Sequence, residues 1–69
     1  MQSKLTFTTE LDNYDTPVSY YLTGDVIDND GNSVPVGEFT FKQNKAWDTL
    51  MYYTQNFKNV IVTFETKRQ

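Results

Sequence analysis

The spacing of apolar residues changes along this chain from two to three or four and back to two, and that change determines the order of its elements. In residues 4–11 apolar and polar side chains alternate, with Leu5 and Phe7 in one row. Alternation of this kind is typical of a strand that buries one face. It returns in residues 18–27, where Gly24 interrupts the row and indicates a bulge.

Two segments rich in Asp, Asn, Gly and Pro follow these strands. Residues 12–17 favour a turn through local side-chain hydrogen bonds and the fixed φ of proline. Residues 28–33 form the strongest turn signal in the chain, because Asn, Asp and Gly tolerate the positive φ that tight hairpins need. We therefore predict a turn over residues 12–17 that ends the first strand and a hairpin loop over residues 28–33.

A third strand is predicted over residues 34–42. We expect Phe39 and Phe41 to lie on its buried face and Glu38 on its exposed face. Pro35 has no backbone N–H to donate, so the start of this strand should lie at an edge of the sheet or outside the pairing.

A helix is predicted from about Asn44 to Phe57, with Asn44 as its N-cap. Its apolar stripe repeats every three or four residues and should face the sheet. The members of that stripe are Ala46, Leu50, Tyr53 and Phe57, flanked by Trp47, Met51 and Thr54. Alternation then predicts a last strand with Val60, Val62 and Phe64 inward, followed by a polar tail over 67–69.

The order β-β-β-α-β predicts a single small α+β domain over residues 1–69, an antiparallel meander with one helix packed on one face of the sheet. A right-handed crossover through the helix would place the fourth strand parallel to the first and beside it. The expected spatial order is therefore third, second, first, fourth.

The composition argues against catalysis and against a bound metal. The chain has no Cys and no His, which removes the usual general base and the commonest metal ligands. The run from Asp28 to Gly31 suggests an EF-hand loop, but with Gly31 at the sixth position the first ligand falls on Val26 and the last on Gly37. No phosphate-binding glycine loop is present. We expect neither enzymatic activity nor a cofactor.

The distribution of charge points to a binding role. Between Leu5 and Phe41 there are seven acidic residues and no basic one, whereas residues 42–69 carry five bases and two acids. An acidic meander could be a solvated face, since Asp suits turns, or it could attract a basic partner. The predicted partner-binding residues are Asp25, Asp28, Asp30 and Glu38, with Tyr14 and Tyr21 as aromatic anchors unless these rings belong to the core.

Other partners fit this sequence less well. Direct nucleic-acid binding needs a positive groove, whereas the strands that carry the candidate rings hold most of the acids. The chain has no apolar run long enough for a membrane span and no recognisable signal peptide, so we expect a cytoplasmic protein, in the host cytoplasm if it is viral. The main rival function is structural assembly by self-association through an edge strand, for example 34–42.

In size, acidity, lack of His and Cys, and meander-plus-helix plan, the chain resembles the small phage-encoded inhibitors of host nucleases and polymerases, including anti-CRISPR proteins. The resemblance covers the chain in outline and transfers no functional residue. It implies a non-enzymatic protein that places carboxylates where nucleic-acid phosphates would otherwise bind, and so occludes the binding site of a basic protein.

Overall fold

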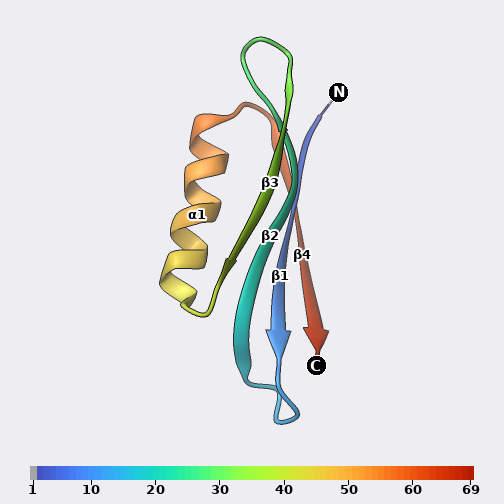
Figure 1. The fold of residues 1–69 in the computed structure, drawn as a ribbon, viewed down its shortest axis with the longest axis vertical. Helices are drawn as coiled ribbons and strands as arrows, with labels where there is room; N and C mark the ends of the chain where they lie inside the picture. Colours follow the sequence, from blue (N-terminus) through green and yellow to red (C-terminus); the bar gives the residue numbers. More distant parts are fainter. Residues whose placement is uncertain (1) are drawn as a thin grey trace.

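A computed structural model describes residues 2–69, in which a four-stranded sheet and one helix form two layers (Figure 1). The chain extends over 44 × 20 × 15 Å. Its elements in order are β1 (Ser3–Leu11), β2 (Pro17–Ile27), β3 (Ser33–Thr40), α1 (Gln43–Asn56) and β4 (Val60–Arg68).

The strands lie in the order β3-β2-β1-β4, which confirms the predicted topology. β2 pairs antiparallel with both β1 and β3. β4 pairs parallel with β1 along its whole length, from Ser3 opposite Val60 to Leu11 opposite Arg68. A parallel neighbour needs a crossover connection, and α1 supplies it.

The core lies between α1 and the face of the sheet that it covers. Its buried apolar side chains come from all of the elements except β4, and they are Leu5, Phe7, Tyr20, Leu22, Val26, Val36, Ala46 and Leu50. The helix contacts β2 and β3 most extensively and stacks Trp47 on Phe7 of β1, with ring centroids 5.0 Å apart, whereas β4 has no buried side chain. Two faces of the sheet result: a helix face, and an open face with no second layer on it (Figure 1).

The structure corrects the predicted faces of β3. Val36 is buried against the helix face, opposite Gly24 of β2. Phe39 is 50% exposed and Phe41 is 73% exposed, whereas both were expected to be buried. Glu38, expected on the outer side, lies instead on the helix face opposite Leu22.

Several predicted boundaries also shift. Asn44 is not the N-cap, because the helix begins at Gln43 and its cap residue, Lys42, makes no side-chain capping bond. Lys67 and Arg68 are not a tail but belong to β4, because β1 is long enough to pair with them.

No bulge occurs at Gly24, which pairs regularly with Leu5; the irregularity in the β1–β2 ladder lies between Glu10 and Leu11. Gly24 instead has a φ of +134°, and a Cβ on it would come within 2.1 Å of the carbonyl oxygen of Lys4. The glycine is therefore needed for the close approach of two strands and for its positive φ.

Within residues 2–69, no helix combines the length and the apolar character that crossing a membrane requires.

Candidate interaction surface

The six predicted partner-binding residues do not form one surface. Tyr14, 87% exposed, lies in the β1–β2 turn, whereas Asp28 and Asp30 lie in the β2–β3 turn at the opposite end of the long axis (Figure 1). Glu38 lies on the helix face, and only Tyr21 and Asp25 share the open face. A partner that meets one of these groups need not meet the others.

Two of the carboxylates have structural roles in turns. The Oδ1 atom of Asp28 accepts hydrogen bonds from the backbone amides of Asp30 at 2.9 Å and Asn32 at 2.8 Å. Oδ1 of Asp12 holds the β1–β2 turn in the same way, accepting from the amides of Tyr14 and Thr16. These bonds explain the acids by turn chemistry, although the charges still contribute to the surface potential.

Two further acidic side chains interact with residues of other elements. Asp15, in the β1–β2 turn, forms an ion pair of 2.6 Å with Arg68 at the end of β4. Glu38 accepts a hydrogen bond of 3.4 Å from the Tyr53 hydroxyl of α1. Burial raises the pKa of Tyr53, and the charge and hydrogen bond of Glu38 raise it further. Glu38 therefore helps to position the helix against β3.

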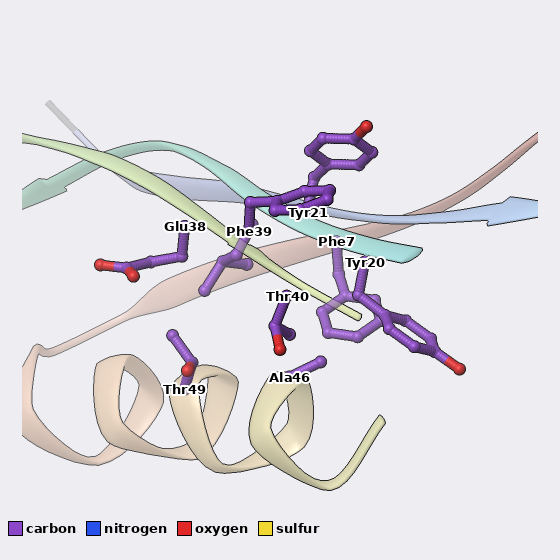
Figure 2. Close-up of a pocket in the computed structure, with 9 residues that line it drawn as sticks. Phe7, Tyr20, Tyr21, Glu38, Phe39, Thr40, Ala46 and Thr49 are labelled. Carbon is purple, nitrogen blue, oxygen red and sulfur yellow. The ribbon is translucent and has the colours of Figure 1, made fainter. Parts of the chain in front are cut away.

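An aromatic cluster on the open face is the main feature that the sequence interpretation missed. Tyr21 of β2 lies directly opposite Phe39 of β3, and their ring centroids are 4.9 Å apart. Phe41 follows β3 and meets Phe39 edge to face at 4.8 Å. Figure 2 shows the rings of Tyr21 and Phe39 on the side of the sheet away from α1, whereas Phe7 and Tyr20 point toward it. We call Tyr21, Phe39 and Phe41 the open-face cluster.

The sequence did carry a signal for this cluster. The apolar residues of β3 fall on even positions at Val34 and Val36 but on odd positions at Phe39 and Phe41. A strand that pairs without a register shift cannot turn both sets to the same side, and β3 pairs with β2 without one. One of the two sets therefore had to lie on the open face.

An open hollow of about 310 Å³ on the open face is lined by Tyr21 with Thr8, Glu10, Thr23 and Lys67, but in the described part of the chain no pocket of ligand size lies under the open-face cluster. A hollow of about 30 Å³ lies beneath it, between β2, β3 and the first half of α1 (Figure 2). This volume holds little more than one water molecule. Among residues 2–69, no three acidic side chains come together as a metal site would require.

Charge near the open-face cluster is mixed, because Glu10 and Lys67 line a hollow together with Tyr21 and Lys42 follows Phe41 in the chain. Asp25 lies on the same strand and the same face as Tyr21, four residues along, with Lys4 of β1 as its direct cross-strand neighbour. The strands that carry the cluster, β2 and β3, hold no basic residue.

Comparisons with protein-family models, with curated proteins and with solved structures give no match. The function is therefore inferred from the residues and their geometry.

Proposed function

We propose that the protein is a non-enzymatic binding module that uses the open-face cluster to bind a basic protein. The main observation behind this proposal is that Phe39 packs against both Tyr21 and Phe41, while the side chains of Phe39 and Phe41 stay at least half exposed. A row of three rings centred on Phe39, on a sheet face with no second layer, resembles the aromatic centre of a protein interface.

Rigidity supports this role. The rings of Tyr21 and Phe39 stand on paired strands and restrict each other's rotation, so little side-chain entropy remains to be lost when a partner covers them. An aromatic side chain contributes a large contact area, and burying it is worth about 1.5–3 kcal/mol. A partner with a shallow apolar pocket would therefore bind here.

The charge of β1 to β3 supports a basic partner. Seven acids and no base lie between Leu5 and Phe41, so this part of the chain carries a formal charge of −7. Arg68 offsets Asp15, Lys4 lies opposite Asp25 and Lys58 lines the same hollow as Asp28, but among the acids of residues 2–69 only Asp15 forms an ion pair. Such charge speeds the encounter with a positive surface and opposes binding to phosphates.

We propose that this binding occludes a nucleic-acid-binding enzyme in the cytoplasm, as the small phage-encoded inhibitors do. The basic surface of such an enzyme would meet the acidic strands, and the open-face cluster would supply most of the binding energy. No chemical step is required of this protein.

The test compares an exposed aromatic residue inside the cluster with one outside it. The wild type, Phe39→Ser and Tyr52→Ser are immobilised and exposed to a host lysate; Tyr52 is the matched control because it is 57% exposed on α1. We expect a basic protein that the wild type and Tyr52→Ser retain and Phe39→Ser loses.

Kinetics with that purified partner then separate the cluster from the charge. Phe39→Ser should raise the dissociation rate by on the order of tenfold or more, as for a central aromatic residue. Asp28→Asn with Asp30→Asn should lower mainly the association rate, and added salt should reduce the wild-type rate. Equal retention by Phe39→Ser and Tyr52→Ser, or an acidic partner, would refute the proposal.

A further inference from the structure

The two edges of the sheet differ in their capacity to pair with another strand. β3 is one edge, and Pro35 within it has no N–H to donate. β4 is the other edge, and its nine residues contain no Pro and no Gly. Trp47 of α1 lies beside Phe64, with ring centroids 6.2 Å apart, but the residues of β4 from Thr63 to Arg68 are all exposed, so the helix leaves this edge open. An uninterrupted strand with free backbone groups is a template for further pairing.

The backbone groups that β4 presents to solvent follow from its pairing with β1. The N–H of Gln69 donates to the carbonyl oxygen of Leu11 in β1 at 3.0 Å. Backbone groups of successive residues in a strand point to opposite sides. The N–H and C=O groups of Arg68, Thr66 and Phe64 therefore point away from β1, toward the free edge.

We propose that a second copy of this chain occupies that edge, with the two β4 strands antiparallel about a two-fold axis at Thr66. This inference is independent of the proposed function. In this register Thr66 faces its own copy, Glu65 faces Lys67, and Phe64 faces Arg68. Each pair is favourable across antiparallel strands: Thr with Thr and Glu with Lys as cross-strand neighbours, and Phe with Arg by cation–π contact.

Neighbouring registers lose this complementarity. An axis at Glu65 places two glutamates opposite each other, and an axis at Lys67 does the same with two lysines. An axis at Phe64 avoids like charges but places Lys67 against Ile61 and leaves Glu65 without a basic partner. The end of β4 is thus chemically self-complementary about Thr66.

The proposed pairing is closed and keeps the open faces free. A two-fold axis between antiparallel edge strands stands perpendicular to the sheet, so both copies present their open faces on the same side. The outer edges of the doubled sheet are the two β3 strands, where Pro35 hinders further growth. Phe64, which is 60% exposed on the helix face, gains the Arg68 side chain of the other copy as a neighbour.

Sedimentation equilibrium and a charge swap test the interface. The wild type should show a concentration-dependent monomer–dimer equilibrium. Lys67→Glu should weaken the dimer by on the order of tenfold or more, because it places like charges opposite each other twice. Combining Glu65→Lys with Lys67→Glu should restore dimerisation, and far-UV circular dichroism checks that each variant folds.

Single cysteines test the register, since the chain has no other thiol. Thr66→Cys should form a disulfide-linked dimer on mild oxidation, because directly opposite residues lie about 5.5 Å apart between Cα atoms. Thr63→Cys on the same strand should not, because in this register residue 63 faces residue 69. A wild type that stays monomeric at millimolar concentration, an unaffected Lys67→Glu dimer, or equal cross-linking of the two cysteine variants would overturn the proposal.

Discussion

Gly24 should be the glycine that this fold tolerates least as alanine. A Cβ at this position would lie 2.1 Å from the carbonyl oxygen of Lys4 and 3.1 Å from the Cα of Leu5, both of them backbone atoms of β1. Its φ of +134° is also one that residues with a side chain rarely adopt. Gly24→Ala therefore forces either two paired strands apart or the backbone into another conformation.

The two effects can be estimated separately. An unfavourable backbone conformation costs about 1–3 kcal/mol, and forcing extra volume into a packed site costs about another 1–3 kcal/mol. The sum of about 2–6 kcal/mol is large beside the roughly 3–10 kcal/mol expected for the unfolding of a domain of this size. We expect Gly24→Ala to lower the free energy of unfolding by at least about 2 kcal/mol.

The other two glycines are matched controls. Gly31 has a φ of +83° and no atom within 4 Å of an added Cβ, so Gly31→Ala should incur only the conformational cost. Gly37 has neither feature, and Gly37→Ala should change stability by less than about 1 kcal/mol. Urea unfolding followed by far-UV circular dichroism measures all three variants. A Gly24→Ala loss no larger than that of Gly31→Ala would refute the reasoning about close approach.

The remaining predictions concern the core, a turn and a tyrosine. Leu50→Ala should cost ~2–5 kcal/mol in the same urea assay, because Leu50 is buried in the core, and the exposed Tyr52→Ala should cost much less. Asp28→Ala should lower the free energy of unfolding by about 1 kcal/mol and Asp28→Asn by less, because Oδ1 of Asp28 accepts two amide hydrogen bonds. Millimolar calcium should leave the melting temperature of the wild type unchanged, and a saturable rise would contradict the interpretation of this loop as a turn. Because the folded state raises the pKa of Tyr53, this residue makes a contribution to stability that is complete below the ordinary tyrosine pKa of 10.0 and is lost as pH rises through the folded-state pKa. Tyr53→Phe should therefore reduce the alkaline loss of stability. Ultraviolet titration should show a lower Tyr53 pKa in Glu38→Gln, because the burial contribution stays while the Glu38 contribution goes; an unchanged pKa would argue against the contact.

Periodicity was sufficient for the order and the topology of the elements. Alternation located all four strands, turn chemistry located both hairpins, and the stripe containing Ala46 and Leu50 located the helix to within one residue at each end. The handedness of crossover connections then fixed β4 beside β1 and parallel to it. These features depend on neighbours in the chain or on a general rule, so one sequence carries them.

The face of each β3 residue was decided only in three dimensions. Within β3 and the residue after it, Val34 and Val36 compete with Phe39 and Phe41 for the helix side, and local alternation favours neither pair. Pairing with β2 places Val36 beside Gly24 in the core and Phe39 beside Tyr21 on the open face. Side-chain volume alone favours the opposite outcome, because the phenylalanines are larger.

The candidate site depended on the same choice. The sequence identified Tyr21 and the excess of acids, and the two predicted turns already implied that Tyr14 and Asp30 lie at opposite ends of β2, so grouping them in one binding surface was inconsistent with the predicted meander. The sequence could not show that Phe39 and Phe41 would join Tyr21 on the open face. Charge and residue type are properties of the sequence, whereas shared position on a surface results from strand register and from which face one short helix can cover.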